Sequence, residues 1–359
     1  MNMSKHGGNG DYLARLYGFN KSKLIDFSAN INPQGISPKA KSAMLASFDE
    51  ILCYPDLTYY DLKNAIATYE QIDEENIMLG NGGAEVIFNI ARALRPKKAL
   101  LFSPTFSEYE EALKTQNTSI TYYKLQADNN FDYDMGILDV ITEELDIMFL
   151  CSPNNPSGNI VSLELLEKML DKAKEDNVIL VVDESFMDFV KDCSEIGAKN
   201  YYDKYENLII LKSATKFFAI PGLRIGYAYT KSAEIINRYS KVAVPWCINS
   251  FASVAFMATA NDKEYLKRSK DYITTQKEKL YDELCCIPGV KPVKPTANFI
   301  LFRIDEKIDL QAEMLKRNVL IRSCANYANL DERYYRVAVR MAEDNEVLVK
   351  VLRECLKKE

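Results

Sequence analysis

Runs of consecutive apolar residues alternate with amphipathic segments through the middle of the chain. Four such runs are ALLF from Ala99, IMFLC from Ile147, VILVVD from Val178 and LIIL from Leu208. Strands that are buried on both faces of a sheet have this continuous apolar pattern. Between two of them, LELLEKMLDKAKED from Leu163 has apolar residues at helical spacing and follows Ser162, a typical helix cap. The pattern predicts an α/β sheet with helices between its strands.

The pattern changes near Asn249. From there a long helical stretch, rich in Lys and Glu, is predicted to run towards Leu284, where IPGV ends it. Two further strands are expected beyond this helix, NFILFRI from Asn298 and YYRVAVR from Tyr334. A second, smaller unit is therefore expected after the alternating region.

The 359 residues, of which 47% are apolar, are more than one small core requires. We predict a large domain over residues 46–248 and a smaller α+β domain over residues 249–359. Residues 1–45 are expected to form an N-terminal arm and part of the smaller domain.

Charge and hydropathy narrow the class of ligand. The formal net charge of −6 is spread over interleaved acidic and basic residues, which argues against nucleic acid and anionic membranes as partners. No stretch approaches the roughly 20 apolar residues of a membrane span, and the first residues have no signal-peptide pattern. We expect a cytoplasmic protein with a small-molecule ligand.

Histidine and cysteine usage excludes several chemistries. His6 is the only histidine, so a Ser/His/Asp triad or a multi-histidine zinc site is not expected. The eight cysteines include the adjacent pair Cys285 and Cys286 but show no CxxC spacing. Neither a zinc ribbon nor a disulfide framework is predicted, and no metal is expected.

Chemically informative residues follow three consecutive predicted strands. CSPNNPSG from Cys151 contains Asn155, VVDES contains Asp183, and LKSATKFFAIPGLRIGY contains Lys216 and Arg224. In an open α/β sheet the ligand binds beyond the carboxyl ends of the strands. These motifs, in this order, resemble the aminotransferase class of fold type I pyridoxal-phosphate enzymes. The resemblance implies a mostly parallel seven-stranded sheet between helices, a smaller α+β domain, and pyridoxal 5'-phosphate as cofactor.

The resemblance implies a role for each of these residues, and the predicted catalytic residues are Lys216 and Asp183. Lys216 would supply the amine for a Schiff base, in an apolar segment beside cations that helps to keep it deprotonated. Asp183 would pair with the protonated pyridine nitrogen, and Asn155 would donate to the phenolate oxygen. Each residue alone has an ordinary interpretation as a solvated lysine, a capping aspartate or a turn asparagine. Because all three lie at successive strand ends, a shared cofactor site is favoured over these separate interpretations.

The cofactor phosphate needs backbone N–H groups at a helix start and at least one cation. Gly82, Gly83 and Ala84 open the apolar-periodic segment GNGGAEVIFNIARAL, which predicts such a helix start. Ser213 and Arg224 match the spacing from the lysine by which the family completes its phosphate cup.

Two aromatic residues complete the predicted cofactor site. Phe106 in SPTFSEYEEAL aligns with the family's aromatic residue that stacks on the pyridine ring, although an aromatic residue here could also belong to the core. Tyr54 in CYPD matches a tyrosine that related enzymes send into the neighbouring subunit's phosphate site. The resemblance therefore implies a homodimer.

Within the class, nearly the whole chain resembles the threonine-phosphate decarboxylases of cobalamin biosynthesis. The motifs that carry this resemblance are HGGN at His6, DFSANINPQG at Asp26, YPDLTYYDL at Tyr54 and IRSCANYANLDERYYRVAVR at Ile321. The histidinol-phosphate aminotransferases share the fold and the cofactor residues and are the alternative. They generally have a tyrosine three residues after the aspartate, where this chain, like the decarboxylase pattern, has Phe186.

The resemblance implies a small phosphorylated amino acid as substrate, with Arg336 as the partner of its α-carboxylate. Arg322 and His6 are candidates for the substrate phosphate, and Arg340 is a further one. The other predicted substrate contacts are Gly7, Gly8, Asn32 and Asn155. O-Phospho-L-threonine and O-phospho-L-serine differ by one methyl group, worth about 1–3 kcal/mol in a pocket, so both stay open as substrates.

A second alternative is not an enzyme but a regulatory protein that binds pyridoxal phosphate with the same fold. Such regulators usually carry a DNA-binding module before the aminotransferase-like part, whereas the family motifs here begin at His6. The acidic charge balance also argues against DNA binding. For an enzyme, decarboxylation or transamination depends on which bond at the α-carbon stands perpendicular to the cofactor ring, and the sequence leaves this open.

Overall fold

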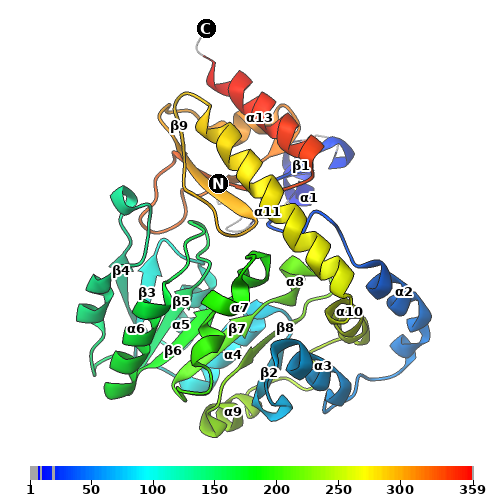
Figure 1. Cartoon of the computed structure of the whole chain (residues 1–359), viewed down its shortest axis with the longest axis vertical. Helices are drawn as coiled ribbons and strands as arrows, with labels where there is room; N and C mark the ends of the chain where they lie inside the picture. Colours follow the sequence, from blue (N-terminus) through cyan, green and yellow to red (C-terminus); the bar gives the residue numbers. More distant parts are fainter. Residues whose placement is uncertain (1–6, 9, 18–20, 358–359) are drawn as a thin grey trace.

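The computed structural model describes residues 7–8, 10–17 and 21–357 of the chain (Figure 1). Its centre is a seven-stranded sheet in the order β2-β8-β7-β6-β5-β3-β4. The strands are β2 (Ile77–Gly80), β3 (Lys98–Ser103), β4 (Ser119–Lys124), β5 (Ile147–Cys151), β6 (Ile179–Asp183), β7 (Leu208–Lys212) and β8 (Gly226–Tyr229). Strand β8 pairs antiparallel with both of its neighbours, and the other pairs are parallel. The predicted mostly parallel seven-stranded sheet is confirmed.

Helices cover both faces of this sheet, which explains the continuous apolar runs. On β7, Ile209 and Leu211 pack in one hydrophobic cluster, and Leu208 and Ile210 pack in the other. Helices α4 (Gly83–Leu94), α5 (Glu108–Lys114) and α9 (Ala233–Ser240) contribute to the first cluster, and α6 (Leu163–Glu175) contributes to the second. Because successive side chains of a strand point to opposite faces, every position must be apolar.

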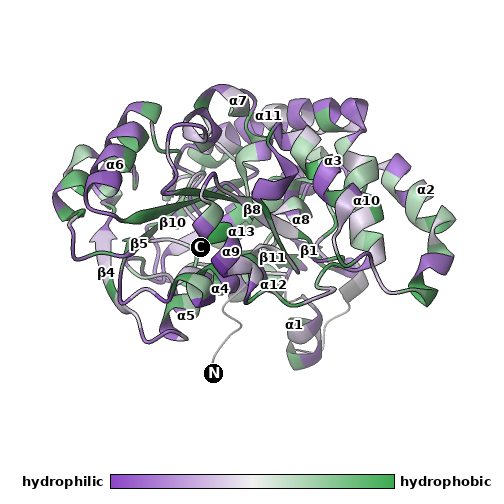
Figure 2. Ribbon diagram, turned by 90° about the horizontal axis from the view of Figure 1, so that it is seen from below, coloured by the Kyte–Doolittle hydropathy of each residue, from purple (hydrophilic) through white to green (hydrophobic). Residues whose placement is uncertain are grey.

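Helix α6 begins where the sequence predicts. The Ser162 side chain accepts a hydrogen bond from the Leu165 N–H at 3.2 Å, as an N-cap does. Along α6, purple hydrophilic and green hydrophobic segments alternate in Figure 2, as expected for a helix with one buried face.

A second sheet lies beside α11 (Lys263–Cys285) and α13 (Ala342–Leu356), the yellow and red helices of Figure 1. It is antiparallel, in the order β12-β13-β10-β9, and consists of β9 (Val290–Pro292), β10 (Phe299–Ile304), β12 (Arg322–Ser323) and β13 (Tyr334–Ala338). Both strands predicted for the C-terminal region, now β10 and β13, are confirmed. The remaining helices include α1 (Gly10–Tyr17), α2 (Pro38–Ala46), α3 (Tyr60–Glu70), α7 (Cys193–Ile196), α8 (Ala214–Phe217) and α12 (Leu310–Leu315).

Strand β1 (Ile25–Asp26) pairs in parallel with β11 (Val319–Leu320), so the N-terminal segment joins the C-terminal one. This pairing supports our proposal that residues 1–45 form part of the smaller domain. Within the described residues, no helix combines the length and the apolar character needed to cross a membrane.

The long helical stretch predicted from Asn249 towards Leu284 is present, but a break divides it into two helices. Helix α10 (Ser250–Ala260) ends before Asn261, and α11 begins after Asp262. Asn and Asp hydrogen-bond to nearby backbone groups and therefore favour helix ends over helix interiors. The Asp262 carboxylate also accepts a hydrogen bond from the Ser37 hydroxyl at 2.7 Å. This bond connects the junction between the two helices to the N-terminal segment.

A buried ion pair joins the ends of β6 and β7. The Lys212 amine lies 3.2 Å from Glu184 Oε2 and 3.8 Å from Asp188 Oδ1, and both Lys212 and Glu184 are buried. Glu184 also accepts from the Ala198 N–H at 2.6 Å. Strand β6 ends at Asp183, and β7 leads to Lys216. The ion pair therefore fixes the two strand ends that carry the predicted catalytic residues.

We predict that Lys212→Met lowers the free energy of unfolding by about 3 kcal/mol or more, because it leaves the buried Glu184 carboxylate without its cation. Urea unfolding followed by circular dichroism measures the change. Lys204→Met is the matched control, since Lys204 pairs with Glu167 at 2.6 Å on the surface and should cost less than about 1 kcal/mol. Equal losses in the two variants would contradict this account.

Candidate active site

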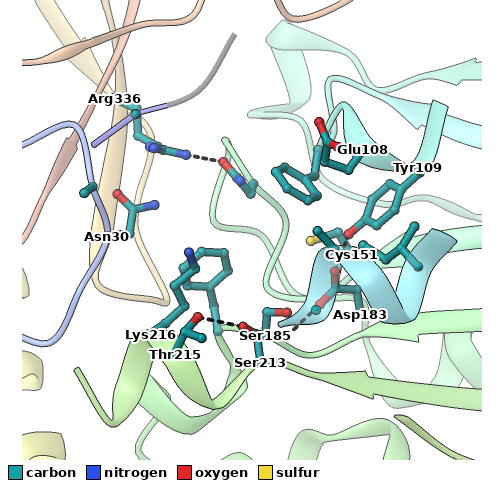
Figure 3. A pocket seen from close by; sticks show the side chains of 18 of the residues that line it. Asn30, Glu108, Tyr109, Cys151, Asp183, Ser185, Ser213, Thr215, Lys216 and Arg336 are labelled. Carbon is teal, nitrogen blue, oxygen red and sulfur yellow. Dashed lines mark hydrogen bonds between the residues drawn. The ribbon is translucent and has the colours of Figure 1, made fainter. Parts of the chain in front are cut away.

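A cavity of about 320 Å³ lies beyond the carboxyl ends of β5, β6 and β7 (Figure 3). This is the position at which open α/β sheets bind ligands. The predicted site residues that line it are Gly7, Gly83, Ala84, Phe106, Asn155, Asp183, Ser213, Lys216, Arg224, Arg322 and Arg336. Residues from both ends of the chain and from its middle therefore meet in one cavity.

Asp183 is the last residue of β6, and its carboxylate is held by two donors. The Tyr109 hydroxyl donates to Oδ2 at 2.6 Å, and the Ser185 N–H donates to Oδ1 at 2.8 Å. Burial raises the pKa of Asp183, while the hydrogen bonds from Ser185 and Tyr109 oppose the rise. A cationic group bound in the cavity would stabilise the ionised carboxylate.

Lys216 lies on the short helix α8, just after β7, and its amine points into the cavity (Figure 3). The pKa of Lys216 is lowered from 10.5 to about 8, chiefly by burial and also by the nearby cations Arg224 and Arg336. The Asp183 carboxylate opposes these effects. A substantial fraction of the amine is therefore neutral near physiological pH, which is the form that attacks a carbonyl.

The start of α4 lies beside Arg224, an arrangement that suits an anion. Gly83 and Ala84 open the helix, and Gly82 precedes it with φ +84°. A Cβ atom on Gly82 would lie 2.3 Å from Arg224 Nη2, so only glycine lets the guanidinium approach the helix start this closely. Helix N–H groups and a cation together bind phosphate well, and Ser213 lines the same cavity.

Two buried arginines line the cavity from the second sheet. Arg336 on β13 is 5% exposed and donates to the Ser28 carbonyl at 2.9 Å and to Asn155 Oδ1. Its Nε has no hydrogen-bond partner among the described residues. Arg322 on β12 is 7% exposed, and burial lowers the pKa of its guanidinium. Two desolvated cations in one cavity favour an anionic ligand.

Asn32, a predicted substrate contact, does not line the cavity. Its Nδ2 donates to the Phe217 carbonyl at 2.9 Å and to the Tyr265 hydroxyl at 3.1 Å, and its Oδ1 accepts from the Gln34 N–H at 3.0 Å. Asn32 therefore supports the backbone that follows Lys216. Asn30 lines the cavity instead, and its buried Oδ1 has no partner among the described residues (Figure 3).

The N-terminal glycines Gly7 and Gly8 lie in different surroundings. Gly7 lines the cavity, as predicted, but the Gly8 N–H donates to the Ser28 hydroxyl at 2.8 Å. The Gly8 amide, a predicted substrate contact, is therefore engaged with Ser28, and Gly8 does not line the cavity. His6 lies outside the described residues, so its role stays a prediction.

Arg340 and Tyr54 do not line the cavity. Arg340 pairs with Asp344 at 2.9 Å and donates to the Asp26 carbonyl at 3.0 Å, so the structure gives it partners outside the site. Tyr54 is 83% exposed, and its ring centroid lies 5.1 Å from that of Trp246. Its predicted place in a neighbouring subunit concerns an assembly that the single chain does not contain.

Several cavity residues were not predicted from the sequence. Tyr109 lies three residues after Phe106, so helical spacing could have placed both on one face. Ser185 follows Asp183 by two residues, a spacing typical of a turn that caps a carboxylate. Thr215 shares a hydrogen bond of 2.9 Å with Ser213. Within the part of the chain that the structure describes, no group of three or more His, Cys, Asp or Glu side chains is placed to hold a metal ion.

Residues 22–352 match the aminotransferase class I and II family, and the chain belongs to this family. Among individual relatives, threonine-phosphate decarboxylase of Salmonella typhimurium is 37% identical over 354 residues, which are 98% of this chain and 97% of the relative. The predicted resemblance to that enzyme is confirmed.

Two solved structures share the fold. Histidinol-phosphate aminotransferase from Clostridium acetobutylicum has a TM-score of 0.88 at 29% identity, over 92% of this chain and 99% of that one. L-threonine-O-3-phosphate decarboxylase from Porphyromonas gingivalis has a TM-score of 0.84 at 24% identity, over 92% and 99%. The fold alone therefore does not separate the two activities.

Proposed function

We propose that the chain is a pyridoxal-phosphate-dependent carboxy-lyase. Its substrate would be O-phospho-L-threonine and its product (R)-1-aminopropan-2-yl phosphate, for cobalamin biosynthesis. The observation that carries the proposal is the pair of buried guanidinium groups, Arg322 and Arg336, in a cavity that the start of α4 also lines. A phosphorylated cofactor and a substrate with both carboxylate and phosphate together need this many positive groups. The 37% identical relative supports the same choice.

The residues present fit pyridoxal 5'-phosphate. The start of α4, Ser213 and Arg224 would hold its phosphate, and the glycine at position 82 leaves the space that brings Arg224 to the helix start. Phe106 would lie against the ring, and the amine of Lys216 would be the point of attachment. The buried Asp183 carboxylate would face a cation on the ring. Such a cation would offset the effect of burial, which raises the pKa of Asp183.

When bound, pyridoxal phosphate supplies a conjugated ring that accepts the electron pair of the bond that breaks. Asp183, fixed by Tyr109 and Ser185, would hold a proton on the ring nitrogen. Arg336 would bind the substrate carboxylate and orient the bond that joins it to the α-carbon. Lys216 would then deliver a proton to the α-carbon after carbon dioxide has left.

The substrate phosphate would lie near Arg322, with Asn30 and Gly7 as further contacts and His6 as a predicted one. A buried phosphate must exchange its water for fixed donors before the site can exclude solvent. The charged guanidinium and the neutral amide of Asn30 can provide such donors.

Histidinol-phosphate aminotransferase is the second candidate, and Phe186 argues against it. This residue lines the cavity and is 5% exposed, and its ring centroid lies 4.9 Å from that of Phe299. A tyrosine at this position would add a hydroxyl group beside the cofactor, whereas phenylalanine has no hydrogen-bonding atom. The decarboxylase pattern also has phenylalanine here.

We predict that the purified, cofactor-loaded protein releases carbon dioxide from O-phospho-L-threonine and forms the matching amine phosphate. Mass spectrometry of the product and trapping of carbon dioxide measure this directly. O-Phospho-L-serine should react more slowly, by roughly 10-fold or more, because one methyl contact is lost. Glutamate formed from 2-oxoglutarate and histidinol phosphate, without decarboxylation of either phosphoamino acid, would instead identify an aminotransferase.

We also propose that two copies of the chain form a dimer through the surface around Tyr54. Large apolar side chains gather on the segment from α2 to the start of α3, namely Leu45, Phe48, Ile51, Leu52, Tyr54, Leu57 and Tyr60, all exposed by more than half. The Tyr54 ring packs beside Trp246, itself 46% exposed. An apolar surface of this kind is typical of a protein interface. Resemblance suggests that Tyr54 reaches the neighbouring phosphate site.

Leu52→Asp should convert the dimer to a monomer, because a carboxylate would be buried without a partner at the interface. Sedimentation velocity measures the mass. Val347→Asp, on an exposed position of α13, is the matched control and should stay dimeric. A monomeric wild-type protein would contradict the proposed interface.

A further inference from the structure

The side-chain amide of Asn155 is held by two donors on its oxygen. Arg336 Nη1 donates to Asn155 Oδ1, and the Tyr327 hydroxyl lies 3.2 Å from the same atom. A guanidinium group can only donate, so the atom that faces it must be the amide oxygen. The tyrosine hydroxyl must then donate as well. The NH₂ group of Asn155, which is 7% exposed and lines the cavity, is therefore the part left for a ligand.

Tyr327 is itself fixed by the loop that follows β12. Its backbone N–H donates to the Cys324 carbonyl at 3.0 Å, and the Arg322 guanidinium lies over its ring, 5.8 Å from the centroid. Tyr327 also lines the cavity. Its hydroxyl thus reaches Asn155 from a segment 172 residues away in the sequence.

The hydroxyl matters because it is one of the two donors that hold the Asn155 amide in this orientation. Phe186 and Phe106 both line the cavity and have no hydrogen-bonding side-chain atom. An asparagine amide can rotate by half a turn at small cost and would then present its oxygen instead. Two donors on Oδ1 oppose that rotation, the charged guanidinium of Arg336 and the neutral hydroxyl of Tyr327, and each hydrogen bond contributes measurably to the preference.

We infer that Tyr327 is a positioning residue that, together with Arg336, turns the NH₂ group of Asn155 toward the phenolate oxygen of the cofactor. This inference rests on the proposed function only in that pyridoxal phosphate occupies the cavity. It adds a consequence for substrate binding. Arg336 and Arg322, the proposed anchors of the substrate anions, are also the residues in contact with Asn155 and Tyr327. Substrate binding and the donor to the cofactor are therefore linked through the same four side chains.

Tyr327→Phe tests this role, because it removes the hydroxyl and keeps the ring under Arg322. The readout is the pH midpoint of the visible absorption change of the cofactor-loaded protein. A donor to the phenolate oxygen stabilises its ionised form, so a weaker donor should raise the midpoint, by about 0.5–1 pH unit for one neutral hydrogen bond. The charged groups that line this cavity are all unchanged by the substitution, namely Glu108, Asp183, Lys216, Arg224, Arg322 and Arg336.

Tyr335→Phe is the matched control. Tyr335 is buried on β13, its hydroxyl lies 3.2 Å from the Ile308 carbonyl, and it does not line the cavity. Its removal should leave the midpoint unchanged. Asn155→Ala should raise the midpoint, and in that background Tyr327→Phe should add nothing, because the hydroxyl acts through Asn155.

An unchanged midpoint in Tyr327→Phe, alongside a shift in Asn155→Ala, would overturn the inference. So would an equal shift from Tyr327→Phe with and without Asn155. The titration needs bound cofactor but no turnover, so its outcome is independent of the product assay. A loaded wild-type protein that releases no carbon dioxide would contradict the proposed reaction and leave the role of Tyr327 to be decided by the titration.

Discussion

The adjacency of three parallel strand ends determines where every other part of the site lies. The register pairs Cys151 with Asp183 and Asp183 with Leu211, so β5, β6 and β7 end at the same edge. The segments that follow β5 and β7 then bring Asn155 and Lys216 into the cavity that Asp183 also lines. Burial acts on this frame: it lowers the pKa of the lysine and raises that of the aspartate. The partly neutral lysine therefore suits an aldehyde, and the buried aspartate suits a cation.

The frame and many of the residues that line the cavity could be predicted because they depend on local signals. Apolar runs marked the strands, and a residue directly after a strand must lie near the edge of the sheet. Asp183, Lys216 and Asn155 were found in this way. Gly83 and Ala84 were found because glycines before an apolar periodic segment indicate a helix start. The order of the motifs then implied the family to which the chain belongs.

The errors and omissions concern the direction of side chains and contacts between distant segments. Asn30 and Asn32 belong to one motif, and the turn between them decides which one faces the cavity; sequence pattern does not describe that turn. The Gly8 amide is engaged by Ser28, a contact across 20 residues. Tyr327 meets Asn155 only because the second sheet packs over the first. The pair Asn261 and Asp262 did carry a local signal, since both residues favour helix ends.

The central claim is that Lys216, opposite Asp183, is the residue to which pyridoxal phosphate attaches. Borohydride reduction of the cofactor-loaded protein converts the lysine–cofactor double bond to a stable amine, and peptide mapping by mass spectrometry then locates the modified residue. The account predicts that the added mass is found on Lys216 and is lost in Lys216→Ala. Modification of a different lysine, or no modification of protein saturated with cofactor, would contradict it.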